Sequence, residues 1–178
     1  MKRIVLVLVS VTVLALAGVA GAQTSGAHFT HGGFPVCTDT GTQLQCTAEL
    51  AGLGNETVVA NLTAPNAVAT DLLCENKGGN QAPGQNPAVP STATGQQTIL
   101  QPKNGRAVID VSTDVPSISA KAAGCPNGNW TVIVGDVEFT SYTLTISQGG
   151  QLVVTCSGTF ENAPSDNGQT DTPTCTFA

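Results

Sequence analysis

Apolar and polar residues alternate along most of this chain, and this period of two constrains its fold more than any other feature. In residues 43–50, for example, Leu44 and Cys46 alternate with Gln45 and Thr47. The same alternation recurs in four further segments: 57–64, 68–75, 107–112 and 142–157. Successive side chains of a β-strand point to opposite faces, so each segment predicts a strand with one buried face.

The last of these segments predicts a β-hairpin. An alternating run begins at Tyr142 and ends at the sequence Gln-Gly-Gly of residues 148–150, where glycine can supply the positive φ angles of a tight turn. In the returning strand, the alternation places Leu152, Val154 and Cys156 on the buried face. In residues 68–75 it likewise predicts that Val68 points inward.

Helical patterns are nearly absent from the sequence. No segment after residue 22 keeps an apolar period of 3.6 residues. Residues 130–139 predict one more long strand, and the frequent Thr, Gly and Pro residues favour strands and turns. About seven to nine short strands are expected, which favours an all-β fold, a β-sandwich with immunoglobulin-like topology.

The first residues have the features of a secretory signal peptide. Lys2 and Arg3 precede an apolar run over residues 4–17, and Ala20-Gly21-Ala22 follows. A retained membrane anchor is the alternative, but a membrane span needs about 20 apolar residues. We therefore expect residues 1–22 to be cleaved and residues 23–178 to form a single secreted, extracellular domain without stable membrane insertion.

The expected mature chain is acidic. It keeps four basic residues (Lys77, Lys103, Arg106 and Lys121) and all twelve acidic ones, for a net charge of −8. No basic patch is available to neutralise phosphate groups, so nucleic acid is not an expected partner. The partners that remain are an extracellular protein or a carbohydrate.

Six cysteines follow the signal: Cys37, Cys46, Cys74, Cys125, Cys156 and Cys175. An even number of cysteines in an exported chain predicts a disulfide framework, for which fifteen pairings exist. We favour bonds between neighbours in the sequence, each stabilising the fold by about 2–4 kcal/mol. A zinc site is the alternative, but no spacing is C-x-x-C and no His follows Cys37, so no metal is predicted.

Residues 76–97 break the alternating pattern. They contain several Gly and Pro residues and a single charge, Lys77, which predicts a long loop. Together with the turns near residues 127–129, this loop is the expected ligand-binding surface. The candidate binding residues are Asn80, Gln81, Gln85, Asn86, Asn127 and Asn129.

Three segments resemble a group of uncharacterised secreted microbial proteins. They read LAGLGN at residues 50–55, CENKGGNQAPGQNP at residues 74–87 and GCPNGNW at residues 124–130. The similarity extends over roughly residues 44–152. It implies export and a β domain, and it implies no activity, because none is known for that group.

One motif points to an enzyme. Asp39-Thr40-Gly41-Thr42 resembles the catalytic turn of aspartic proteases, in which two Asp side chains share a proton. The sequence at residues 132–136 is similar to the apolar stretch that packs beside that turn. Only one such Asp occurs, so a homodimer would be required, and the residues before Asp39 are not apolar as they are in the proteases.

Other catalytic or cofactor sites find little support. His28 and His31 both lie near the start of the mature chain, which excludes a Ser-His-Asp set. A copper site at His28 would lack a distant second His. Asp166 and Asp171 could bind Ca²⁺ weakly, although loop acids are usually solvated. We therefore predict no catalytic residue and no cofactor.

The leading hypothesis is a structural, adhesive or ligand-binding module, and the alternative is a dimeric aspartic-protease-like hydrolase acting through Asp39. Trp130, the single Trp, is expected in the core, since a lone Trp usually fills a sandwich interior. Stacking of its ring on a sugar is the other interpretation.

Overall fold

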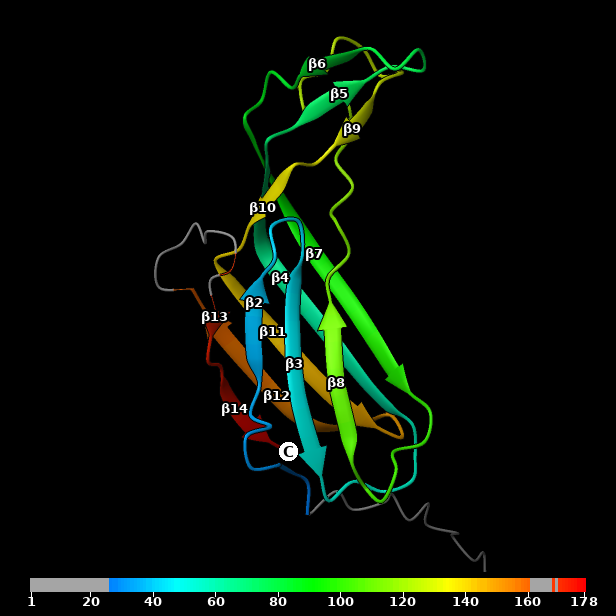
Figure 1. The fold of residues 1–178 in the computed structure, drawn as a ribbon, viewed down its shortest axis with the longest axis vertical. Coiled ribbons are helices and arrows are strands. Elements are labelled where there is room, and N and C mark those ends of the chain that lie inside the picture. Colours follow the sequence, from blue (N-terminus) through cyan, green and yellow to red (C-terminus); the bar gives the residue numbers. More distant parts are fainter. Residues whose placement is uncertain (1–25, 161–167, 169) are drawn as a thin grey trace, which may run out of the picture.

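The computed structural model describes residues 26–160, 168 and 170–178, and all regular structure in these residues is β-strand. The predicted signal peptide and Asp166 lie outside the described residues. The strands form two large sheets that lie face to face and a small third sheet at one end (Figure 1). We call the two large sheets, A and B, the body.

Sheet A forms the front layer in Figure 1. Its central strand β3 pairs with β8 on one side and with β2 and the short β1 on the other, and β13 pairs with β2. The strands are β1 (His28–Phe29), β2 (Val36–Asp39), β3 (Leu44–Ala51), β8 (Ala107–Ser112) and β13 (Thr170–Asp171).

Sheet B forms the layer behind it. β4 pairs with β7 on one side and with β10 and β11 on the other, and β12 and β14 complete the sheet. The strands are β4 (Val58–Thr70), β7 (Ala88–Ile99), β10 (Asp136–Glu138), β11 (Ser141–Gln148), β12 (Gln151–Thr159) and β14 (Thr174–Phe177).

Sheet C has the order β6-β5-β9 and lies beyond the end of the body. Its strands are β5 (Leu73–Glu75), β6 (Gln81–Pro83) and β9 (Thr131–Ile133). The predicted loop at residues 76–97 is therefore wrong, because residues 81–83 and 88–97 lie in strands. The predicted long strand at residues 130–139 is also wrong, because it divides into β9 and β10, which belong to different sheets.

The alternation found in the sequence places the core correctly in most strands. Leu44, Leu50, Leu62, Ile109 and Leu144 are fully buried between the two sheets. All these residues belong to one cluster that draws its side chains from both sheets. The predicted inward faces of residues 43–50, 57–64 and 107–112 are confirmed.

Two β-bulges explain where the alternation fails. The register of β4 on β7 shifts between Ala64 and Ala67, so that Ala67 and Ala69 are buried and Val68 is only half-buried. A bulge moves every later side chain of its strand to the other face. The prediction that Val68 points inward is therefore wrong.

The predicted hairpin joins β11 to β12. Its turn residues Gly149 and Gly150 have φ angles of 56° and 82°, as the tightest hairpin turn requires. A register shift next to Ser147 adds one residue to β12, so that Val153 and Val154 are both buried while Leu152 is 48% exposed. Burial of Leu152 was therefore predicted wrongly.

The three disulfides join the predicted pairs. Two of them connect residues directly opposite each other on neighbouring strands, Cys37 to Cys46 across β2 and β3 and Cys156 to Cys175 across β12 and β14. The third, Cys74 to Cys125, lies outside the body. No cysteine in the described residues is free.

At one lateral edge the two sheets approach each other closely. The Asp110 N–H donates a hydrogen bond to Oε1 of Gln97 (2.9 Å), and the Asp114 N–H donates to the Thr94 carbonyl (2.7 Å). A Cβ atom at Gly95 would collide with the backbone of Ser112. Glycine is required at residue 95 because β7 passes directly against β8.

Gln148 organises the opposite end of the body from sheet C. It is 1% exposed, and its amide fits the loop between β3 and β4. Its Oε1 accepts from the Gly54 N–H (2.9 Å), and its Nε2 donates to the carbonyls of Gly54 (3.0 Å) and Glu56 (3.1 Å). One buried side chain thus satisfies three backbone groups of a loop.

We expect Gln148→Leu, which keeps a similar volume, to lower the free energy of unfolding by about 2–3 kcal/mol, because three hydrogen bonds between the side chain and the loop backbone are lost, at about 1 kcal/mol each. Denaturant titration measures this change. The control is Gln151→Leu, at an exposed position across the same turn. A loss below about 0.5 kcal/mol for Gln148→Leu would contradict the assignment, since this is the size of an ordinary surface substitution.

Candidate ligand-binding lobe

Residues 71–87 and 115–135 form a separate projection, which we call the lobe (Figure 1). Within residues 70–136, all of which are described, the chain passes between body and lobe four times: from β4 to β5, from β6 to β7, after β8, and from β9 to β10. All four passages lie at the same end of the body. The lobe therefore rests on a base of four chain segments.

A small apolar cluster fixes these four segments to one another. Leu72 and Ala123 are buried together with Ala69 at the end of β4, and half-buried Ile118 and Val134 pack against them. Its buried residues are distinct from those of the main core, and Val134 packs against both clusters. The lobe thus has its own interior, although a much smaller one than the body.

Backbone hydrogen bonds reinforce this base. The Gly84 N–H donates to the Leu72 carbonyl (2.7 Å), and the Gly135 N–H donates to the Asp71 carbonyl (3.2 Å). A Cβ atom at Gly84 would lie 2.8 Å from the Ala123 carbonyl oxygen, so the chain has no room for a side chain there. These contacts join segments that are up to 64 residues apart in the sequence.

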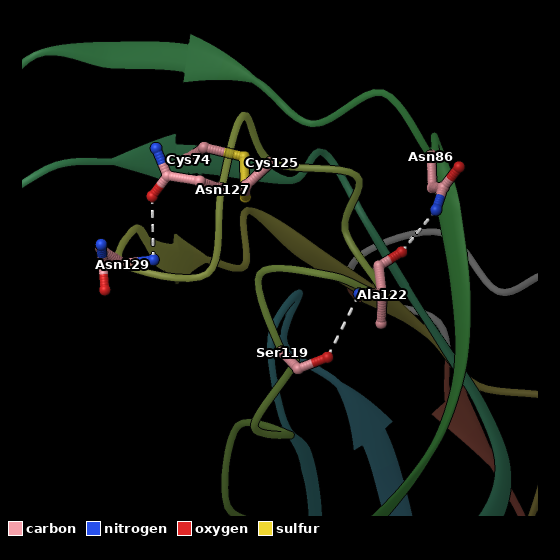
Figure 2. The surroundings of a disulfide bond; sticks show 7 residues. All are labelled: Cys74, Asn86, Ser119, Ala122, Cys125, Asn127 and Asn129. Atoms are coloured by element: carbon pink, nitrogen blue, oxygen red, sulfur yellow. Dashed lines mark hydrogen bonds between the residues drawn. A yellow bond between two sulfur atoms is a disulfide. The ribbon is translucent and has the colours of Figure 1, made fainter.

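The disulfide between Cys74 and Cys125 closes the lobe. It joins the middle of β5 to the segment that precedes β9, with a Cα–Cα distance of 5.7 Å (Figure 2). Cys74 is fully buried and points away from the exposed face of sheet C. The bond closes a loop of 51 residues that includes β6, β7 and β8.

All six predicted binding residues lie in the lobe, and all six are exposed. Four of them lie at the same end of sheet C, two at the turn between β5 and β6 and two in the segment leading into β9. These four are Asn80, Gln81, Asn127 and Asn129. Gln85 and Asn86 lie elsewhere, on the chain leading to β7, so the structure does not bring all six together.

Several of these amides have structural partners. Asn127 Oδ1 accepts from the Asn129 N–H (3.0 Å), and Asn86 Nδ2 donates to the Ala122 carbonyl (2.6 Å), as Figure 2 shows. Asn80 is held against the Asn76 side chain, whose Oδ1 accepts from the Asn80 N–H (3.0 Å). Asn86 and Asn127 therefore shape the lobe, and their side chains are only in part open to a ligand.

The exposed face of sheet C contains residues that the sequence analysis did not single out. Leu73 pairs with Ile133 on one side and with Pro83 on the other, which gives a row of three exposed apolar side chains. Leu73 is 39% and Ile133 is 40% exposed. These strands are three residues long, too short for alternation to reveal which side chains face outward.

A polar row lies beside this apolar row on the same face. Glu75 pairs with both Gln81 and Thr131, and Nε2 of Gln81 donates a hydrogen bond of 2.7 Å to Oε2 of Glu75. This bond orients the carboxylate on the face of the sheet. We call the six side chains of the two rows the sheet C face: Leu73, Glu75, Gln81, Pro83, Thr131 and Ile133.

Trp130 immediately precedes β9 and is half-buried. It belongs to neither buried cluster, so the prediction that it fills the core is wrong. The buried residues of the cluster at the lobe are Leu72 and Ala123 together with Ala69 of β4, so no aromatic side chain belongs to it.

The motif at Asp39 forms the turn between β2 and β3. Asp39 is fully buried, and its Oδ1 accepts a hydrogen bond from the Gly41 N–H (2.8 Å). The Gly41 carbonyl accepts from the N–H of Val137 in β10 (2.9 Å), so the turn is covered by sheet B. Short Asp side chains commonly bond the backbone two residues ahead in such turns.

In comparisons with known proteins, no family model, no curated protein and no solved structure matches this chain. The described residues include no helix that could span a membrane. They also include no group of three or more His, Cys, Asp or Glu side chains arranged to hold a metal ion.

We expect the double substitution Cys74→Ser and Cys125→Ser to loosen the lobe and leave the body folded, because this bond joins two segments of the lobe. A disulfide that closes a 51-residue loop stabilises the folded state by about 4 kcal/mol, since it restricts the unfolded chain. Amide hydrogen exchange would show faster exchange in β5, β6 and β9 and retained protection in β3 and β11. Equal acceleration in β3 and β11 would mean that lobe and body unfold as one unit.

Proposed function

We propose that this chain is an exported, non-enzymatic binding module in which an immunoglobulin-like β-sandwich carries a lobe that docks an extracellular protein. One observation carries the proposal: sheet C, which has its own disulfide, lies at the end of the body and exposes the apolar side chains of Leu73 and Ile133 to solvent. Such an element adds little to the main core, so its construction is better explained by contact with a partner.

The strand order supports the immunoglobulin-like assignment. In that fold the first, second and fifth strands lie in one sheet, and the third, sixth and seventh lie in the other. If the body strands are counted as β2, β3, β4, β7, β8, β11 and β12, then β2, β3 and β8 share sheet A while β4, β11 and β12 share sheet B. The fourth strand, β7, pairs with β4, as the additional strand of variable-type domains does.

Three disulfides with no free cysteine among the described residues support export, because such bonds persist in oxidising compartments. An acidic mature chain with a cleaved signal fits the same assignment. The protein is then expected to act outside the cell that makes it.

The sheet C face has the composition of a small protein-docking surface. Its apolar row of Leu73, Ile133 and Pro83 lies beside polar Glu75 and Gln81, and protein interfaces commonly have an apolar centre and a polar rim. Side chains held on strands and closed by a disulfide lose little freedom on binding, which lowers the entropic cost of association.

The geometry at Asp39 favours this function over an aspartic-protease-like hydrolase. A homodimeric protease would need the Asp39 carboxylate at an accessible surface, opposite its copy in the partner chain. In this structure the residue is buried and its Oδ1 accepts from the Gly41 N–H. These contacts are explained by a structural role of Asp39 in the turn, and no catalytic role is needed to account for them.

We expect the double substitution Leu73→Asp and Ile133→Asp to reduce binding of the labelled protein to washed cells and secreted proteins of the producing organism by at least about tenfold, since two desolvated carboxylates would oppose contact. The matched control is Val108→Asp, at a position 64% exposed near the start of β8, at the end of the body away from the lobe. Unchanged binding by the double variant, with the control equal to wild type, would refute the sheet C face as the site.

We expect no pepstatin-sensitive proteolysis of a denatured protein substrate at acid pH, and we expect Asp39→Asn to alter stability only. Thermal unfolding and a fluorogenic protease assay measure the two effects. Pepstatin-sensitive activity in wild type that Asp39→Asn removes would establish the hydrolase instead.

A further inference from the structure

The outer face of sheet B forms an array of hydroxyl and amide groups. Cross-strand pairing aligns Thr94, Thr63, Thr143, Ser157 and Thr174 in one row over five neighbouring strands. A second row contains Gln96, Asn61, Thr145, Thr155 and Thr176. With strands about 4.8 Å apart, each row extends over about 19 Å.

Two hollows lie along the first row. One, of about 490 Å³, is lined by Ser141, Thr143, Ser157 and Thr174 among others, and a second, of about 420 Å³, is lined by Thr63, Thr94 and Gln96 among others. Thr63 in the second hollow pairs directly with Thr143 in the first. The two hollows therefore adjoin and make a shallow trough that runs across the strands.

The five strands that form the two rows carry no charge. The strands β4, β7, β11, β12 and β14, all within the described residues, contain no Asp, Glu, Lys or Arg. The charges of sheet B are confined to β10, near the lobe, and Asp114 lies at the rim of the second hollow. Protein surfaces usually carry interspersed charged side chains, so a wide array without charge on five neighbouring strands points to a ligand.

We propose that this trough binds an extended, uncharged polysaccharide. Ser and Thr hydroxyls both donate and accept hydrogen bonds, as do Asn and Gln amides, and these groups match the hydroxyls and ring oxygens of a neutral sugar chain. An anionic polymer would find no cation there. The two rows contain no aromatic, Met or Arg anchor of the kind that dominates protein interfaces, so this ligand differs from the partner of the sheet C face.

The test measures retention of the purified protein in affinity electrophoresis gels that contain a neutral soluble polysaccharide, with mannan, β-1,3-glucan, hydroxyethyl cellulose and dextran as the panel. Carboxymethyl cellulose serves as the anionic comparison. We expect wild type to be retarded by at least one neutral polymer and Thr143→Arg to weaken that retardation at least tenfold, because a long cation fills the middle of the trough.

The matched control is Thr47→Arg, an exposed strand position on the outer face of sheet A. It should be retarded like wild type, and so should Leu73→Asp, which separates this site from the proposed function of the lobe. Thr143→Val, which removes only the hydroxyl, should weaken retardation without affecting the fold. Absence of retardation of wild type by all four neutral polymers, or equal retardation of wild type and Thr143→Arg, would overturn the proposal.

Discussion

The structure depends on the burial of two sheet faces against each other. The inward side chains of sheets A and B form one cluster in which Leu, Val, Ile and Ala predominate, with Phe139 and Tyr142 among its few aromatic members. Short side chains let the sheets approach closely, and at one edge the approach admits only glycine, at residue 95. Because burial of apolar area is the main favourable term in folding, this interior holds the body together, and the lobe relies on the body as its base.

Much of this core could be derived from the sequence, since the alternation in residues 43–50 and 107–112 identifies the buried face of each strand correctly. The disulfide pairing could also be predicted, because the six cysteines pair in the order in which they occur along the chain. The errors have specific physical causes. Bulges next to Ala64 and in β12 shift the alternation by one residue. Pro65 is a local signal for the first bulge, because proline inside a sheet is confined to edges and bulges, and the prediction did not use it.

The lobe was the least predictable part. Its three strands are each three residues long, and its composition of Gly, Pro, Asn and Gln is that of a loop. What orders it is a set of contacts between distant segments, such as Gly84 with Leu72 and Cys74 with Cys125. The binding residues predicted from the sequence all lie in the lobe, but the prediction did not include Leu73 and Ile133, whose exposure depends on the pairing of the three short strands.

The four chain passages at one end of the body have a consequence for protein engineering. The lobe is joined to the body through a narrow set of contacts, so the lobe can be exchanged while the interior between sheets A and B stays intact. Randomising the outward positions of its three short strands, with the cysteine bridge kept, would turn the domain into a display scaffold. Rigid strands would then present the diversified residues, in contrast to antibody domains, where flexible hypervariable loops do so.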